Sequence, residues 1–129
     1  MARQALAKMR ARFPTAVELV YDNYNALAIG YAPSERTSEA IFSIALYPRW
    51  VSLFFLQAKG NLPDPHGLLK GSGTMVRYIR LESPETLDDT RVRELMVAAL
   101  KSAKVAFRAD GAHALVIKSI SAKQRPRRP

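Results

Sequence analysis

The residues with the clearest chemical potential lie in a connector rich in proline and glycine. Lys70, Gly71, Ser72 and Gly73 follow one another there, and Arg77 comes four residues later. Glycine lets a bound group approach the backbone amides closely, while lysine and arginine supply cationic donors. The connector is therefore the first candidate for a small-anion site. The GxxxxGK[ST] spacing of a nucleotide-phosphate loop is absent, so an ordinary two-glycine turn is the alternative interpretation.

Two aromatic residues, Tyr47 and Trp50, could add stacking surfaces to a ligand site, or to single-stranded nucleic acid on an open sheet. Aromatic side chains on strands more often belong to the core. The strand expected around Trp50 alternates two largely apolar sets, Trp50, Phe54 and Leu56 on one side and Val51, Leu53 and Phe55 on the other. Both faces of this strand are therefore expected to be buried, and an uncovered face would need a partner.

Metal ligands are few, because the chain has no cysteine and only two histidines. Asp64 and His66 are two residues apart on the connector, and Asp22 is one of the few carboxylates in the first third of the chain. Hard cations such as iron need several oxygen ligands brought together. A weak metal site at these three residues is one hypothesis, and a turn aspartate beside an exposed histidine is the alternative.

No local motif for catalysis is present in the sequence. The serines have no base that the sequence identifies, and neither histidine has a nucleophile and an orienting carboxylate beside it. Catalytic residues can converge from distant positions, so the sequence favours a binding protein without excluding an enzyme.

The net charge of +9 is concentrated at the C-terminus. Lys123, Arg125, Arg127 and Arg128 belong to a tail that has no acidic residue. Such a tail can contact nucleic-acid phosphates with a salt-dependent affinity, or it can simply be a solvated terminus.

Length and composition predict one globular domain over residues 1–117, followed by the basic tail over 118–129. A chain of 129 residues that is 48% hydrophobic is large enough to bury a core without disulfides. The apolar runs are far shorter than the roughly 20 residues that span a bilayer, and the N-terminus lacks a signal-peptide core. The cysteine-free composition suits a reducing compartment, so we expect a cytoplasmic protein that does not enter the membrane.

The first half of the chain predicts two helices and then three strands. A helix is expected over 2–12, and the capping-box spacing of Thr15 and Glu18 predicts a second short helix that ends near Asp22. Alternating apolar residues predict strands from 25 to about 32, over 41–47 and over 50–56, with a polar hairpin loop at 34–38. These strands should form an antiparallel meander.

The second half predicts one strand, the main helix and one more short strand. The connector over 61–73 should contain only a helical turn near 67–70, and the next strand should run over 75–81. Apolar residues at spacings of three and four predict a helix over 90–107. A last strand is expected over 115–120. The fold class is therefore α+β, a single antiparallel sheet of about four to five strands packed against N- and C-terminal helices.

Four blocks of the sequence resemble a known family. They are YPRWVSL at 47–53, LPDP at 62–65, GLLKGSG at 67–73 and VRYIRL at 76–81. In order and spacing they are similar to the YdhG-like domain, a bacterial domain of unknown function, and the resemblance covers roughly residues 13–108.

This resemblance implies a fold similar to frataxin and, by analogy with one family member, a role as an iron chaperone. A frataxin-type iron surface is an acidic ridge on the first helix and the adjoining strand, whereas the helix expected here has four basic residues and no acidic one. We therefore expect, first, binding of a small anion or a protein partner without catalysis. Iron binding and nucleic-acid association through the tail are the alternatives, and no cofactor is expected except iron through the resemblance.

Overall fold

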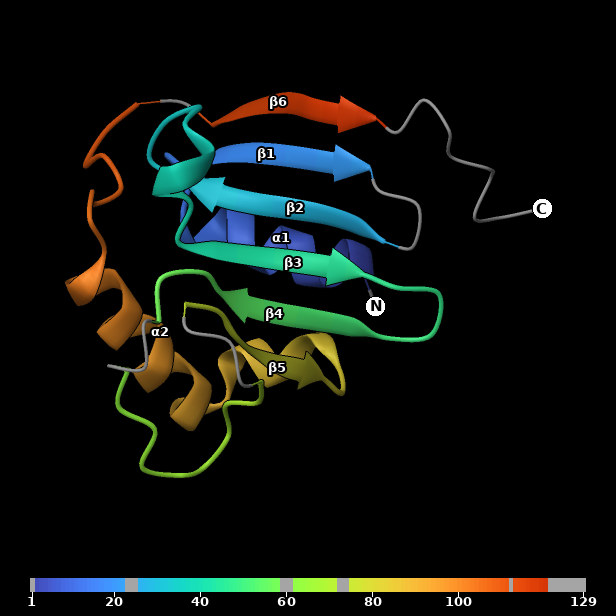
Figure 1. The fold of residues 1–129 in the computed structure, drawn as a ribbon, viewed down its shortest axis with the longest axis vertical. Coiled ribbons are helices and arrows are strands. Elements are labelled where there is room, and N and C mark those ends of the chain that lie inside the picture. The colour runs from blue at the N-terminus through green and yellow to red at the C-terminus, as the bar shows by residue number, and fades with distance from the viewer. Residues whose placement is uncertain (1, 23–25, 59–61, 72–74, 112, 121–129) are drawn as a thin grey trace.

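The computed structural model describes residues 2–22, 26–58, 62–71, 75–111 and 113–120, which form one mixed sheet with helices on one face (Figure 1). The elements in chain order are α1 (Ala2–Arg12), β1 (Val17–Asp22), β2 (Leu27–Ala32), the 3-10 helix η1 (Thr37–Glu39), β3 (Phe42–Leu46), β4 (Val51–Phe55), β5 (Arg77–Leu81), the 3-10 helix η2 (Pro84–Asp88), α2 (Thr90–Ser102) and β6 (Ala114–Ile120).

The fold is α+β, as the sequence predicts, but its sheet has six strands and is mixed. The strand order is β5-β4-β3-β2-β1-β6. Strands β2, β3 and β4 form the expected antiparallel meander, and β1 and β5 extend it at its two ends. After α2 the chain returns to the far edge of the sheet, where β6 pairs with β1 in parallel (Figure 1). This last pairing makes β1 an interior strand, second from the edge of the sheet.

The prediction of a second helix over residues 15–22 is wrong, because Val17–Asp22 is strand β1. Its alternating residues are rich in β-branched and aromatic types, which suit a pleated strand. Val17 pairs with Ala32 on one side and with Ala114 on the other, so β1 is hydrogen-bonded along both edges. These pairings on both edges outweigh the local capping-box spacing.

Helix α2 begins at Thr90 as predicted but ends at Ser102, five residues before the predicted end. Ala103 already has extended backbone angles. The Lys104 amide then donates to the side-chain oxygen Oε1 of Gln57 at 3.0 Å, and the centroid of the Phe107 ring lies 5.0 Å from that of Phe13. These contacts hold the segment after α2 in an extended path toward β6.

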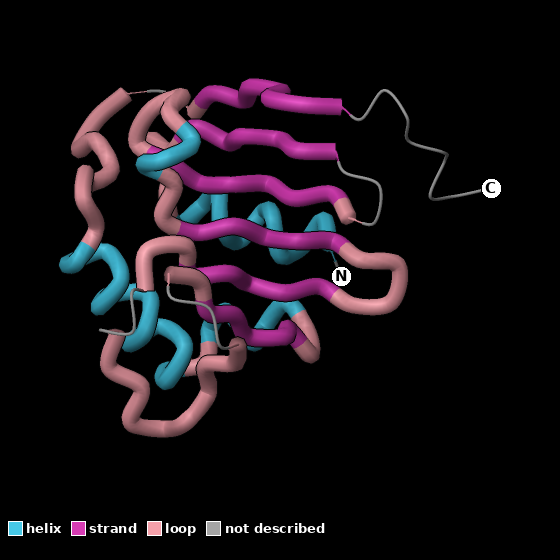
Figure 2. Tube along the Cα trace, viewed as in Figure 1, coloured by secondary structure: helices cyan, strands magenta, loops and turns pink. Residues whose placement is uncertain are grey.

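Helices α1 and α2 cover one face of the sheet (Figure 2). Val51, Leu53 and Phe55 point to that side and are buried in the main core. On the other face of β4, Phe54 is half-buried and stacks on Tyr78 at 5.3 Å. The expectation that both faces would be buried is therefore correct for the helix side alone.

Candidate ligand-binding site

The glycine-containing connector forms a strand-like bridge where a helical turn near 67–70 was predicted. The Lys70 amide donates to the Tyr78 carbonyl at 2.8 Å, and the Tyr78 amide donates to the Lys70 carbonyl at 3.0 Å. Gly71 has a φ of 107°, a conformation that favours glycine. Ser72 and Gly73 lie outside the described residues. The Lys70 amide is thus already paired, although its side chain is exposed.

Arg77 lies at the start of β5, on the side of the sheet that faces the helices. It shares this face with Ile79 and Leu81, which are buried, and its Nη1 donates to the Val76 carbonyl at 3.0 Å. Arg77 pairs with Phe55 at one end of the β4–β5 ladder.

The predicted aromatic residues lie at the other end of this ladder, where Val51 pairs with Leu81. Four residue steps along β5, from Arg77 to Leu81, separate the two ends of the ladder, which is about 13 Å at the usual rise per residue. The structure therefore brings Tyr47 and Trp50 together but leaves Lys70 and Arg77 at the opposite end of the ladder.

Tyr47 and Trp50 are the first and last residues of the four-residue connection between β3 and β4. The Tyr47 amide donates to the Trp50 carbonyl at 2.9 Å, and the two rings lie 5.4 Å apart with a tilt of 35°. Trp50 keeps 42% of its surface exposed. Together with the start of α1 and the end of β5, these residues line a hollow of about 380 Å³, which we call the Trp50 hollow.

Two arginines give the Trp50 hollow its positive charge. Arg80 pairs with Ser52, so its side chain lies on the same face as that of Trp50, and its guanidinium is 5.1 Å from the Trp50 ring centroid. A guanidinium stacked on a ring still presents its N–H donors around its edge. Arg49 lines the hollow as well. Neither arginine side chain has a hydrogen bond or an ion pair to any other residue that the structure describes.

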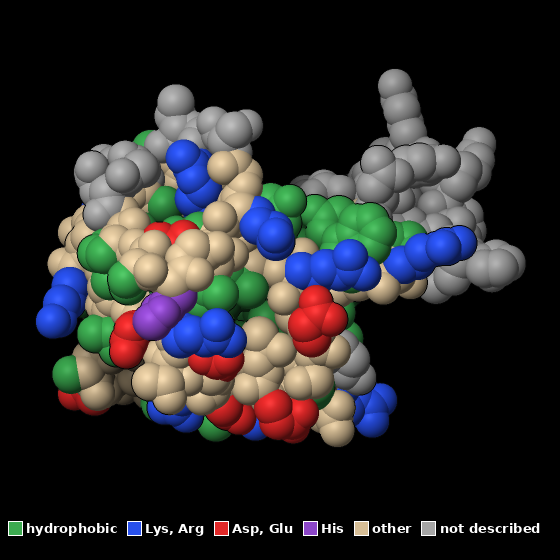
Figure 3. Space-filling view, turned by 90° about the horizontal axis from the view of Figure 1, so that it is seen from below, with side chains coloured by type: hydrophobic (Ala, Val, Ile, Leu, Met, Phe, Trp, Pro, Cys, Tyr) green, Lys and Arg blue, Asp and Glu red, His purple; other side chains and the backbone are tan. Residues whose placement is uncertain are grey.

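Glu82 also lines this hollow, so its three charged side chains sum to +1. Figure 3, which views the molecule from the β5 side, shows basic side chains beside hydrophobic ones at the end of the sheet where β3 turns into β4. Arg49 was not among the residues predicted from the sequence, and Arg80 was considered only as the alternative to Arg77 beside the connector. The signal available was the alternation of β5, which places Arg80 and Arg77 on opposite faces.

Of the three metal candidates, Asp64 and His66 share the connector but have different partners, and Asp22 lies elsewhere. Asp64 uses both carboxylate oxygens to accept the amides of Leu68 and Leu69, each at 2.9 Å. His66 Nε2 lies 3.6 Å from Glu94 Oε1. Asp22 is the last residue of β1, which ends on the side of the molecule away from the connector (Figure 1). Within the described ranges, no three acidic or histidine side chains lie close enough together to hold a metal ion.

The nucleic-acid candidates Lys123, Arg125, Arg127 and Arg128 lie outside the described residues, and their contribution remains a prediction of the sequence.

A buried charged cluster around Glu18 was not predicted by the sequence. The Glu18 side chain is completely buried and accepts hydrogen bonds from Tyr31 Oη at 2.8 Å and from Arg10 Nε at 3.0 Å. His113 Nε2 lies 2.7 Å from its other oxygen. These contacts tie α1, β1, β2 and the segment before β6 together. The capping-box spacing had assigned Glu18 to a helix start, so its strand environment was missed.

The contacts of Glu18 fix its protonation state. Burial raises the pKa of the Glu18 carboxyl, but the hydrogen bonds from Arg10, His113 and Tyr31 outweigh burial, so the pKa lies below its ordinary value. Burial and the neighbouring Glu18 carboxylate raise the pKa of Tyr31. Glu18 is thus a charged acceptor and Tyr31 a neutral donor at neutral pH. The cluster is suited to holding structural elements together.

No protein-family model, curated protein sequence or solved structure matches this chain. Among the described residues, no helix has both the length and the apolar character needed to cross a membrane.

Proposed function

We propose that the protein is a non-catalytic binding protein for a small anionic ligand, and that the ligand binds in the Trp50 hollow. The observation that carries the proposal is the pair of arginines there. Arg80 is held over Trp50 while its N–H donors stay available, and Arg49 lies at the same hollow without a carboxylate partner in the described chain. Two unpaired guanidiniums beside an exposed aromatic ring suit a carboxylate, phosphate or sulfate group.

The size and charge of the hollow limit the ligand. Its volume of about 380 Å³ lies at the lower end of the range of about 300–1,000 Å³ typical of small-molecule sites. Glu82 opposes part of the positive charge, so a compact ligand with one anionic group fits better than a polyanion. The exposed part of Trp50 offers an apolar contact for the rest of the ligand.

Membership of the YdhG-like family is proposed from the four sequence blocks alone. One of these blocks, YPRWVSL, contributes Tyr47, Arg49 and Trp50 to the hollow, and another, VRYIRL, contributes Arg80. Two blocks that are separate in the sequence therefore meet at one place in the structure, which supports a shared functional role for them.

A thermal-shift screen tests the proposal. The wild-type protein is melted with small phosphates, sulfates and carboxylates. A ligand at about 100 times its dissociation constant should stabilise the folded state by about 2.7 kcal/mol, which corresponds to several degrees for a domain of this size.

The double variant Arg49→Ala/Arg80→Ala should lose this shift. The control Arg36→Ala/Lys101→Ala removes the same number of charges from two exposed residues whose side chains have no partner in the described chain. It should keep the shift. An equal loss in both double variants would show nonspecific charge attraction, and retention in the Arg49→Ala/Arg80→Ala variant would overturn the site.

A further inference from the structure

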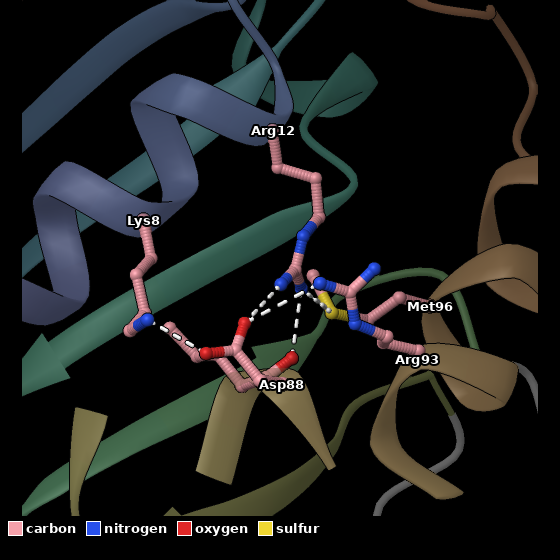
Figure 4. Close-up of polar contacts among 6 residues, drawn as sticks. Lys8, Arg12, Asp88, Arg93 and Met96 are labelled. Atoms are coloured by element: carbon pink, nitrogen blue, oxygen red, sulfur yellow. Dashed lines mark hydrogen bonds and ion pairs between the residues drawn. The ribbon is translucent and has the colours of Figure 1, made fainter. Parts of the chain in front are cut away.

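A second group of cations lies between the two helices, on the opposite side of the sheet from the Trp50–Arg80 pair. Three basic side chains converge there on the carboxylate of Asp88 (Figure 4). Lys8 Nζ lies 2.6 Å from one oxygen of Asp88, and Arg12 Nη2 lies 2.9 Å from the other. Arg93 Nη2 contacts that second oxygen at 3.4 Å. One carboxylate thus faces three cations, which leaves a local charge of +2.

Arg12 is fixed in position at the centre of this group. Its Nη1 donates to the Leu87 carbonyl at 2.9 Å and contacts Met96 Sδ at 3.3 Å (Figure 4). Its side chain is only 20% exposed. Burial and the nearby Arg93 guanidinium lower the pKa of Arg12, as expected where positive charge is in excess. The helices therefore hold a cation ready for a further anion.

The cations border two adjoining hollows between α1 and α2. The first has a volume of about 390 Å³ and is lined by the side chains around Asp88. The second, of about 270 Å³, is lined mainly by Phe13, Met96, Val97 and Leu100. Arg12 and Arg93 line both hollows, so the charged and apolar parts are continuous. We call the two together the interhelical groove.

The apolar part of the interhelical groove is accessible. Val97 on α2 keeps 49% of its surface exposed. A short apolar chain laid along Val97 and Leu100 would remove this surface from water, which is favourable in proportion to the area buried. With cations at one end and apolar side chains at the other, the interhelical groove is complementary to an amphipathic ligand with an anionic head group.

We propose that the interhelical groove binds an amphipathic anion, best matched by a phosphate monoester of a short alkyl chain. Its phosphate lies beside Lys8, Arg12 and Arg93, and its chain lies along Val97 and Leu100. A phosphate monoester carries a charge of about −1.5 to −2 at neutral pH, which balances the excess of +2. Arg93, with 56% of its side chain exposed and a long contact to Asp88, can turn its donors to the ligand.

This site is independent of the Trp50 hollow, since the two share no lining residue. Ligand binding in the interhelical groove can therefore be tested independently of the function proposed above. It differs also in the ligand, because the interhelical groove requires an apolar chain next to the charge.

Isothermal titration calorimetry with octyl phosphate, kept below its critical micelle concentration, tests the proposal. Inorganic phosphate supplies the head without the chain, and octanol supplies the chain without the head. Octyl phosphate should bind at least about tenfold more tightly than either, since both parts of the groove contribute. Equal affinity for octyl phosphate and inorganic phosphate, or no binding at all, would overturn the proposal.

Matched variants locate the binding. Arg93→Ala should weaken octyl phosphate binding about fivefold or more, and Val97→Glu should abolish it by placing a carboxylate on the apolar part. Arg91→Ala is the control, because Arg91 is on the same helix with a similar exposure of 51%, pairs with Asp89 and lines neither hollow. Equal effects of the Arg93 and Arg91 variants would contradict the site.

Two further measurements distinguish binding in the interhelical groove from binding in the Trp50 hollow and from binding to membranes. Arg49→Ala should leave octyl phosphate binding unchanged, and a loss there with no effect of Arg93→Ala would move the ligand to the Trp50 hollow and overturn the proposal. Co-sedimentation with vesicles that contain phosphatidic acid tests a membrane source of the same head group. Binding to the vesicles without binding to free octyl phosphate would rule out a soluble ligand in the groove.

Discussion

Arg80 lies with its guanidinium 5.1 Å from the ring centroid of Trp50, on the face of the sheet opposite α1 and α2. Arg80 is on β5 and Trp50 immediately precedes β4, so the β4–β5 register brings them together. This contact holds the Arg80 guanidinium at the Trp50 hollow. Its N–H groups donate to no carboxylate among the residues that the structure describes. The contact with Trp50 is the structural basis of the proposed anion site.

Replacing Glu82 should strengthen anion binding. Glu82 lines the Trp50 hollow with the two arginines, and its charge repels an anionic ligand. Glu82→Gln keeps the size of the side chain and should increase the affinity about two- to tenfold at low ionic strength, with a smaller gain at high salt because of screening. Titration calorimetry with a ligand from the thermal-shift screen measures the effect, and Glu85→Gln on η2 is the control. Weaker binding by the Glu82 variant would show that the ligand does not lie beside this carboxylate.

Removing the Tyr31 hydroxyl should destabilise the fold. Tyr31 is completely buried and donates to Glu18 at 2.8 Å. Tyr31→Phe leaves the ring in place but removes a hydrogen bond to a charged group, so the free energy of unfolding should fall by about 1–3 kcal/mol. Urea denaturation measures the change, with Tyr47→Phe as a control at a half-buried residue. An unchanged midpoint would mean that the hydroxyl does not stabilise Glu18.

The Glu18 cluster should make stability depend on pH on the acidic side. The pKa of Glu18 is lower in the folded protein than its ordinary value of about 4.3, so its stabilising contribution is complete above that value. It is lost as the pH falls through the lower pKa of the folded state. We expect the difference in unfolding free energy between wild type and Glu18→Gln to be largest near neutral pH and to shrink below about pH 4.

Urea unfolding of both proteins at several pH values between 3 and 7 provides this test. The comparison removes the contributions of other carboxylates, which are the same in both proteins. A difference that stays constant over this range would contradict the lowered pKa of Glu18.

Helix α2 should depend on its N-cap. The Asp89 side chain accepts the Arg91 amide at 2.8 Å. Asp89→Ala should lower the unfolding free energy by about 1 kcal/mol, whereas Asp89→Asn keeps a capping oxygen and should cost much less. Thermal or urea denaturation separates the two variants. Equal losses would assign the effect to the ion pair with Arg91 in place of the cap.

Local patterns predicted most of the elements. Helix α1 has the predicted bounds, and strands β2 to β5 lie within or close to the predicted ranges. Strand β1 was missed because pairing with β2, and with β6 from the far end of the chain, outweighs the local capping-box spacing. The early end of α2 likewise depends on a contact with Gln57, which lies 47 residues away from Lys104.

The candidate site was predicted only in part, for the same physical reason. Tyr47 and Trp50 are close in the sequence, so their proximity could be anticipated. Arg80 joins them through the pairing of β4 with β5, across a connector whose length the strand pattern did not constrain. The residues around Asp88 come from α1, η2 and α2, and no sequence spacing brings them together.

Tryptophan fluorescence is the most direct test of anion binding in the Trp50 hollow, because Trp50 is the only tryptophan in the chain. A small anionic ligand found in the thermal-shift screen is titrated into wild type, Arg49→Ala and Arg36→Ala, with emission excited at 295 nm. We expect a saturable change of Trp50 emission in wild type and Arg36→Ala, and at least about fivefold weaker binding in Arg49→Ala. Saturable binding by calorimetry without any change in Trp50 emission, or equal affinities for all three proteins, would contradict binding in the Trp50 hollow.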